Sequence, residues 1–129
     1  MRLGYVILFV VDVNASVAFY ERAFGLVRRF AHESGTYAEM ETGATALAFA
    51  DEAFVAGQGQ DFAPNRLASR AAGAEIALVT DDVPAAFARA VACGAVAVAS
   101  PTQKPWGQTV ADVRDRDGFL VEICSPLGG

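Results

Sequence analysis

Apolar residues along the chain follow two different periods. Residues 5–11 and 75–80 are short, nearly continuous apolar runs, which are typical of buried strands. After each run the apolar positions recur at i, i+4, i+7 and i+11, the spacing of one face of an amphipathic helix. Each half of the chain is therefore predicted to begin with a strand followed by a helix. The helix positions are Val13, Val17, Tyr20 and Phe24 in the first half and Val83, Phe87, Ala90 and Gly94 in the second.

The two strand–helix segments repeat each other. Residues 12–19 align with residues 82–89 at an offset of 70. Either Asp12 or Asn14 is expected to cap the first helix, and Asp82 the second. A glycine follows each helix, at the position where C-terminal caps favour glycine. Because capping residues, helix faces and glycines agree in both halves, we interpret the repeat as a duplication and not as a chance likeness of two alanine-rich helices.

Three further strands are predicted after each helix. They span 26–31, 37–41 and 44–50 in the first half and 95–99, 108–114 and 119–125 in the second, with a strong hairpin signal at Asp-Arg-Asp-Gly before the last one. We predict an α+β fold in which two tandem βαβββ units form curved mixed sheets around a cup, with the helices on the outer face. The 129 residues are expected to form one domain, made of a first unit (1–50), a connector (51–73) and a second unit (74–129).

Charge and composition exclude several classes of function. The formal net charge is −5 and no cationic cluster exists beyond Arg28-Arg29, so no nucleic-acid partner is expected. The longest apolar run is far shorter than a membrane span, so no membrane partner is expected either. Because the N-terminus shows no signal-peptide pattern, we expect a cytoplasmic protein. Its two cysteines, Cys93 and Cys124, match no metal or redox spacing.

Both ends of the chain resemble a known superfamily. Residues 5–20 and the Phe-Gly-Leu sequence at 24–26 are similar to the opening of vicinal oxygen chelate proteins, and residues 115–123 resemble their closing hairpin. This superfamily includes glyoxalase I, the extradiol dioxygenases, fosfomycin-inactivating transferases and bleomycin-resistance proteins. The resemblance covers nearly the whole chain. It implies the paired-unit fold and is much less specific for an activity.

The resemblance also implies where a metal ion would bind. Metal-using members place four ligands, histidine or a carboxylate, on the first and last strands of each unit. These positions correspond here to Tyr5, Leu47, Glu75 and Glu122. Leucine does not bind a metal ion, a phenol does so poorly at neutral pH, and the only histidine, His32, lies elsewhere. We therefore expect no metal ion and no cofactor, which excludes an extradiol dioxygenase.

Alternation along the strands predicts which side chains share the cup. Glu75 and Glu122 are expected to lie in an apolar cup, where two carboxylates are costly unless a cation or a shared proton satisfies them. They are the candidate catalytic or cation-binding residues; the alternative is that they are relics bonded to Arg70, Arg114 or backbone amides. Trp106 is equally consistent with a rim aromatic and with a cover over the core. The candidate ligand-binding residues are Tyr5, Leu47, Phe49, Trp106 and Gln108.

Two functions fit this interpretation. The first is a metal-independent small-molecule binding protein of the glyoxalase/bleomycin-resistance type, which sequesters a cationic or aromatic compound. The alternative is a lyase or isomerase in which Glu75 and Glu122 act as base or hold a residual divalent ion such as magnesium or manganese. The sequence leaves open whether the protein is a binder or an enzyme. By resemblance we expect a homodimer, whose units pair either within one chain or between two chains.

Overall fold

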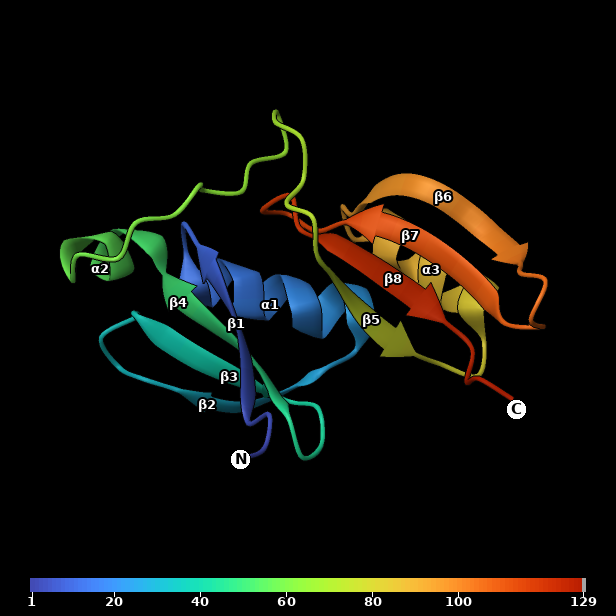
Figure 1. The fold of residues 1–129 in the computed structure, drawn as a ribbon, viewed down its shortest axis with the longest axis horizontal. Helices are drawn as coiled ribbons and strands as arrows, with labels where there is room; N and C mark the ends of the chain where they lie inside the picture. The colour runs from blue at the N-terminus through green and yellow to red at the C-terminus, as the bar shows by residue number, and fades with distance from the viewer. Residues whose placement is uncertain (129) are drawn as a thin grey trace. The chain divides into compact units, whose positions relative to one another are not determined.

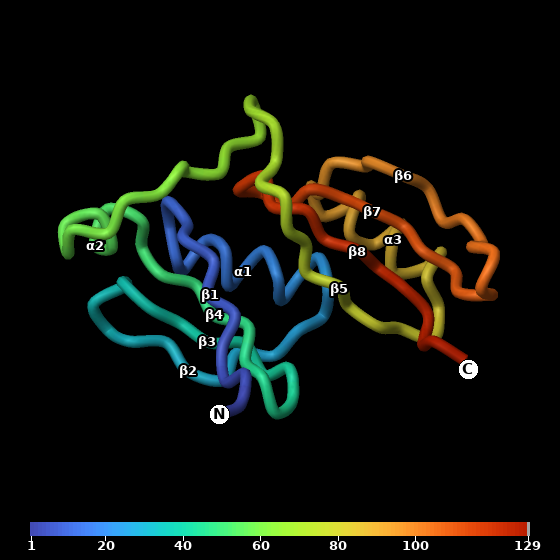
Figure 2. The backbone as a smooth tube through the Cα atoms, in the orientation of Figure 1, coloured from blue at the N-terminus to red at the C-terminus, as the bar shows by residue number. Residues whose placement is uncertain are grey.

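The chain divides into two compact units, Met1–Pro64 and a second unit that begins at Asn65. The computed structural model describes residues 1–128; Gly129, the last residue of the predicted second unit, lies outside the described residues. Each unit has its own four-stranded sheet (Figures 1 and 2). The predicted connector, residues 51–73, is therefore divided between the two units.

The first unit is a mixed sheet with a helix inserted after its first strand. Its elements are β1 (Tyr5–Val10), α1 (Val13–Phe24), β2 (Val27–Ala31), β3 (Tyr37–Glu41), β4 (Ala46–Asp51) and α2 (Glu52–Gly57). The strand order is β1-β4-β3-β2, with β1 parallel to β4 and the other neighbours antiparallel. Figure 1 shows α1 lying across one face of this sheet. We call the opposite face the open face.

The second unit repeats this arrangement. Its elements are β5 (Glu75–Val79), α3 (Val83–Ala92), β6 (Val96–Gln103), β7 (Thr109–Arg114) and β8 (Leu120–Cys124). The strand order is β5-β8-β7-β6, with β5 parallel to β8. α3 contacts β6, β7 and β8, so this sheet also has a helix-covered face and an open face (Figure 1). The predicted βαβββ order is confirmed in both units.

Both long helices begin where the sequence predicts. The Asp12 carboxylate accepts a hydrogen bond from the Ala15 N–H at 3.0 Å, and the Asp82 carboxylate accepts one from the Ala85 N–H at 3.1 Å. Asp12, and not Asn14, is thus the cap of α1. A cap of this kind stabilises a helix by about 1 kcal/mol. The same capping in both units agrees with the predicted duplication.

The core of the first unit lies between α1 and the sheet. The Phe49 ring on β4 packs against Tyr20 of α1, with ring centroids 5.0 Å apart, and both side chains are 0% exposed. Leu47 shares the helix-facing side of β4 with Phe49 and is also buried. The prediction that Leu47 and Phe49 face the cup is therefore wrong.

A one-residue shift in the predicted strand equivalence explains this error. In the strand registers, Ala48 occupies the position in β4 that Glu122 occupies in β8. The prediction instead matched Leu47 with Glu122, the same offset of 75 that separates Gly43 from Gly118. These glycines lie at different places in two turns of unequal length. A slip of one residue turns every side chain of a strand to the other face.

Two segments differ from the predicted elements. Residues 52–57, predicted as part of the connector, form the short helix α2, whose first turn is capped by the Asp51 carboxylate. β6 continues to Gln103, beyond the predicted end at residue 99 and through Pro101. β6 is an edge strand, and an edge tolerates a proline, which has no N–H to donate to a ladder.

The helices are short. The longest is α1, with 12 residues, and no helix within residues 1–128 is long and apolar enough to cross a lipid bilayer.

Candidate functional site

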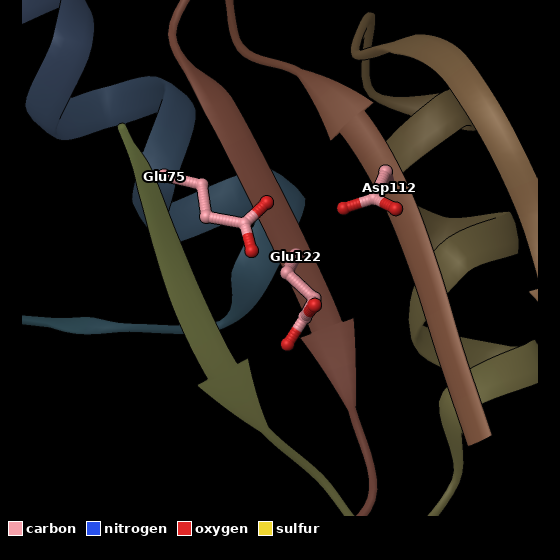
Figure 3. A group of neighbouring side chains, drawn as sticks. All are labelled: Glu75, Asp112 and Glu122. Atoms are coloured by element: carbon pink, nitrogen blue, oxygen red, sulfur yellow. The ribbon is translucent and has the colours of Figure 1, made fainter. Parts of the chain in front are cut away.

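Three carboxylates lie together on the open face of the second sheet (Figure 3). They belong to Glu75 on β5, Asp112 on β7 and Glu122 on β8, and one oxygen of each lies within 4.8 Å of the others. Glu75 is exposed, whereas Asp112 and Glu122 are half-buried. We call these three residues the carboxylate cluster. The predicted pair, Glu75 and Glu122, is brought together, and Asp112 joins it.

Strand pairing brings the three side chains onto one face. Asp112 and Glu122 are direct cross-strand partners in the antiparallel β7–β8 ladder, so their side chains stand side by side. On the other side of β8, the parallel partner of Glu122 is Ala77. Glu75 precedes Ala77 by two residues and therefore projects from the same face. The cluster follows directly from the strand order β5-β8-β7.

Asp112 is the functional candidate that sequence reasoning missed. The signal was present in the hairpin that was predicted around residues 115–118. A turn there pairs residues that precede and follow it on the same face, which brings position 112 opposite Glu122. Asp112 lies on neither the first nor the last strand of its unit, where the superfamily resemblance places the ligands, and only the hairpin pairing across the turn reveals it.

The proximity of the three carboxylates disfavours their charged forms. Burial raises the pKa of Glu75 above its usual range, and repulsion from Glu122 and Asp112 raises it further. Burial and the charge of Glu122 likewise raise the pKa of Asp112, an effect that the Lys104 ammonium partly offsets. A bound cation would remove this repulsion, so the cluster favours positive charge more strongly than a single exposed carboxylate does.

The arginines proposed as partners of the cluster lie elsewhere. Arg114, two residues beyond Asp112 on β7, donates hydrogen bonds of 2.8, 3.1 and 2.9 Å to the backbone carbonyls of Arg66, Leu67 and Gly118. Within residues 1–128, none of the three carboxylates forms an ion pair with a lysine or arginine. The alternative that Glu75 and Glu122 are relics paired with Arg70 or Arg114 is therefore wrong.

A repeated β-bulge explains why an arginine lies beside the acid of β3 and not beside the acid of β7. The β2–β3 and β6–β7 ladders each contain a bulge at the equivalent place, and the extra residue is Arg29 in one and Val98 in the other. Beside these bulges, Glu39 on β3 is the counterpart of Asp112 on β7. Arg29 Nε lies 3.9 Å from a Glu39 oxygen and 3.6 Å from a Glu41 oxygen. Val98 offers Asp112 no such charge.

The four-ligand metal site implied by the resemblance does not fit these residues. A methyl group cannot bind a metal ion, and a neutral phenol does so poorly. His32 lies in the β2–β3 turn, where its Nδ1 is 2.7 Å from the Ser34 hydroxyl. Only the carboxylates of the second unit remain as donors for a cation. The four equivalent positions in the strand registers hold Tyr5, Ala48, Glu75 and Glu122.

An aromatic cavity lies at the ends of β5 and β8. Trp106, which is 62% exposed, donates its indole N–H to Gln108 Oε1 at 2.9 Å. Gln108 Nε2 in turn donates to the Ser125 carbonyl at 2.9 Å. These bonds hold the ring at the surface, so the alternative that Trp106 covers the core is wrong. The cavity has a volume of about 460 Å³ and is lined by Asp81, Trp106, Gly107, Ser125, Pro126 and Gly128.

The aromatic cavity and the carboxylate cluster are separate along β7. Gln108 precedes Asp112 by four residues, which corresponds to roughly 13 Å in an extended strand. Between them lie the cross-strand partners Val110 and Cys124, both buried. Burial, together with a hydrogen bond to Glu122, raises the pKa of the Cys124 thiol, which therefore stays protonated. The predicted ligand-binding pair Trp106 and Gln108 is thus held together, at some distance from the two glutamates.

Comparison with known proteins finds relatives over almost the full chain. The family model of the Glyoxalase/Bleomycin resistance protein/Dioxygenase superfamily matches residues 2–123. A glyoxalase-related enzyme from Fulvimarina pelagi has a TM-score of 0.82 at 21% identity, over 98% of this chain and 88% of that chain. TioX from Micromonospora sp. ML1 has a TM-score of 0.71 at 25% identity, over 98% and 100%. A protein of unknown function from Agrobacterium tumefaciens str. C58 has a TM-score of 0.79 at 25% identity, over 98% and 95%. No curated protein sequence matches.

Proposed function

The chain belongs to the glyoxalase/bleomycin resistance protein/dioxygenase superfamily, and we propose that it binds a small organic molecule whose positively charged group lies in the carboxylate cluster. The observation that carries this proposal is the juxtaposition of Glu75, Asp112 and Glu122 without an ion-paired lysine or arginine in residues 1–128. Partly desolvated carboxylates that form no ion pair favour an ammonium, amidinium or guanidinium group, which binds through charge-assisted hydrogen bonds.

The spacing of the carboxylates supports an organic cation. An ammonium that donates to three oxygens at about 2.8 Å holds those oxygens roughly 4.6 Å apart. An octahedral Mg²⁺, with ligands at about 2.1 Å, holds adjacent ligands only about 3 Å apart. One oxygen of each cluster residue lies within 4.8 Å of the others, which leaves room for an ammonium that donates to all three. On this proposal the protein works without a metal ion.

Trp106 is proposed to stack on the planar part of the same ligand. Its ring is exposed and is held by the hydrogen bond to Gln108, so little ordering is lost on stacking. Since roughly 13 Å of strand separates Gln108 from Asp112, the ligand must be elongated, with a cationic end and an aromatic end. Asp81, which also lines the aromatic cavity, would favour a second positive charge at that end.

A second candidate function rests on the same cluster. Three carboxylate oxygens from adjacent strands also suit a hard divalent cation such as Mn²⁺ or Ca²⁺. In that case the protein would be a lyase or isomerase, with Glu75 or Glu122 as a general base. The raised pKa values of Glu75 and Asp112 make these carboxyl groups better proton acceptors than ordinary surface carboxylates.

Calorimetric titration of the full chain with matched probes tests the proposal. Tryptamine and tryptophol share an indole ring and differ in carrying an ammonium or a hydroxyl group. Both are too short to reach Trp106 from the carboxylate cluster, so this pair tests the cluster alone. Tryptamine is expected to bind at least tenfold more tightly than tryptophol, and Glu122→Gln and Asp112→Asn are expected to reduce the difference. Glu33→Gln, an exposed acid in the β2–β3 turn, removes the same charge and is expected to have no effect. Bleomycin is a larger probe of the same kind.

The outcomes separate the two functions. Equal binding of tryptamine and tryptophol, or equal loss in Glu33→Gln and Glu122→Gln, would overturn the organic-cation proposal. A parallel titration with MnCl₂ and CaCl₂ addresses the second candidate. The metal-dependent enzyme would be favoured if one ion binds tightly per chain, if Glu122→Gln abolishes that binding, and if tryptamine does not affect it.

We extend the proposal to the assembly and the cellular location. The superfamily resemblance supports a homodimer, and the two cysteines, which form no disulfide with each other, are consistent with the cytoplasm. Sedimentation velocity of the full chain tests the dimer: a single species of monomer mass at micromolar concentration would contradict it.

A further inference from the structure

A cavity in the first unit presents cationic groups. It has a volume of about 310 Å³ and is lined by Arg2, Gly4, Tyr5, Arg29 and Ala44, none of which is acidic. Residues 1–64 contain four arginines, no lysine and eight acidic residues. Two of the four arginines line this one cavity, in a unit that is acidic as a whole. We propose that the cavity binds an oxyanion, namely the carboxylate or phosphate group of a small molecule.

Arg29 reaches the cavity because of the bulge in β2. The β2–β3 register shifts between Arg28 and Phe30, which leaves Arg29 as the extra residue. Its Nε lies 3.6 Å from Glu41 and 3.9 Å from Glu39, contacts that are longer than hydrogen bonds. Within residues 1–128 the guanidinium donates no hydrogen bond, so its N–H groups are available to a ligand.

The acids near Arg29 do not cancel its charge completely. Glu39 already accepts a hydrogen bond from the Tyr37 hydroxyl at 2.7 Å. Burial and this bond raise the pKa of Tyr37, so the hydroxyl keeps its proton and remains a donor. Glu41 is exposed and its contact with Arg29 is screened by water. Neither Glu39 nor Glu41 lines the cavity.

Arg2 and Tyr5 complete the cavity from a fixed segment of backbone. The Gly4 carbonyl accepts a hydrogen bond from Ala46 N–H at 2.9 Å, and the Leu3 carbonyl accepts one from the Thr45 hydroxyl at 2.8 Å. These bonds tie the segment between Arg2 and Tyr5 to the β3–β4 turn. Neither side chain has a hydrogen-bond partner within the described chain.

All three side chains offer hydrogen-bond donors suited to an oxyanion. Arg2 and Arg29 present guanidinium forks, which match the paired oxygens of a carboxylate or phosphate, and Tyr5 adds a hydroxyl. A water molecule accepts a hydrogen bond from one of these donors at a time, whereas one anion accepts hydrogen bonds from several of them together. The same position in the second unit carries the acid Glu75 in place of Tyr5. This inference does not rest on the proposed function, because it concerns different residues and a ligand group of opposite charge.

Nuclear magnetic resonance titration of the full chain with inorganic phosphate, and separately with benzoate, tests the inference. Saturable shifts are expected at the Gly4 and Ala44 amides. Arg29→Gln and Arg2→Gln are each expected to weaken binding by about tenfold. Arg28→Gln is the matched control, because Arg28 is adjacent in sequence but pairs with Glu21 at 3.5 Å, outside the cavity. Tighter binding of phosphate identifies a phosphate group as the preferred ligand, and tighter binding of benzoate a carboxylate.

Two results would overturn the inference. One is the absence of saturable shifts with either probe at millimolar concentration in unsubstituted protein. The other is an equal loss of binding in Arg28→Gln and Arg29→Gln, which would indicate attraction to the general surface charge. The Arg2→Gln variant keeps the test valid if Arg29→Gln unfolds, since Arg2 is exposed and precedes the first strand.

Discussion

Asp112 and Glu122 face each other as direct cross-strand partners, so two negative charges stand where an antiparallel ladder favours opposite charges. The first unit has Glu39 opposite Ala48 at this position, one acid against a methyl group. The second unit therefore carries a repulsive pair that the fold does not need. Local destabilisation of this kind is typical of functional sites, where binding is gained at the expense of stability.

Glu122→Gln is expected to stabilise the protein at neutral pH by about 0.5 kcal/mol, because it relieves the repulsion on Asp112 and Glu75. The folded-state pKa values of Glu75 and Asp112 are raised. Their contribution to stability is therefore complete below the unfolded-state pKa and is lost as the pH rises through the folded-state pKa. The gain from Glu122→Gln should accordingly be present near pH 7 and disappear below about pH 4.

Thermal unfolding of the two proteins across this pH range measures the effect. Glu33→Gln serves as the control, since it lowers the net negative charge equally at an exposed position in the first unit. A constant difference between Glu122→Gln and the parent at all pH values would show that the carboxylates do not interact.

Phe49→Ala is expected to destabilise the protein by about 3–5 kcal/mol, as for other large buried aromatics. The ring is fully buried against Tyr20 of α1. Tyr5→Ala, on the open face where the side chain is 55% exposed, is expected to change stability by less than about 0.5 kcal/mol. Urea unfolding of both variants checks the assignment of faces. A mild effect of Phe49→Ala would mean that the ring faces the open side after all.

Gly118→Ala is expected to destabilise the β7–β8 turn by roughly 3 kcal/mol or more, through strain and collision together. Gly118 has a φ of +95°, and an added Cβ would lie 2.7 Å from the Arg66 carbonyl carbon and 2.8 Å from the Leu67 nitrogen. Gly43, in the β3–β4 turn, has a φ of +100° but nothing within 4 Å of such a Cβ. Gly43→Ala is therefore expected to destabilise the protein by about 1 kcal/mol through backbone strain alone, without a steric collision. Equal melting temperatures for the two variants would argue against the close approach of residues 66–67 to the turn.

Trp106 gives the protein a fluorescence reporter, because it is the only tryptophan in the chain. Since the ring is largely exposed, its emission is expected to be that of a hydrated indole and to be quenched efficiently by acrylamide. A non-fluorescent aromatic cation such as benzamidine should shift the emission to shorter wavelength and protect it from acrylamide. Gln108→Leu, which removes the hydrogen bond to the indole, should weaken this protection. Inaccessibility to acrylamide in the free protein would contradict the exposed position.

The fold could be predicted in nearly complete form because both halves of the chain carry the same pattern of strands, caps and helices. Capping residues such as Asp12 and Asp82 mark the helix starts, and the matching segments confirm one another. Within the site, alternation along β5 and β8 correctly placed Glu75 and Glu122 on one face. These predictions rest on local chemistry and on the period of two, both of which a sequence displays directly.

What the sequence did not reveal depends on register and on side chains far apart in the chain. Leu47 was assigned to the wrong face of the sheet because the two units differ by one residue in a turn. No local sequence pattern indicates such a shift in register. The bulge that places Arg29 over β3 has no distinctive sequence, and Arg2 lies 27 positions away from it. Cavities assembled from such residues become visible only when the strand pairing is known in full.

β2 and β6 each contain a bulge at the equivalent position, and the extra residue of that bulge determines whether a positive charge lies beside the acids of its sheet. Arg29 and Val98 occupy this edge position in the two units, outside both helix-packed cores. Exchange of these two residues would change the charge on each sheet by one unit while leaving every carboxylate, cap and core contact in place. After duplication, the two copies could thus diverge in ligand preference through a position that folding does not constrain. Ligand preference in such a scaffold can change through one edge residue in each sheet, with the carboxylates and the helix-packed cores unaltered.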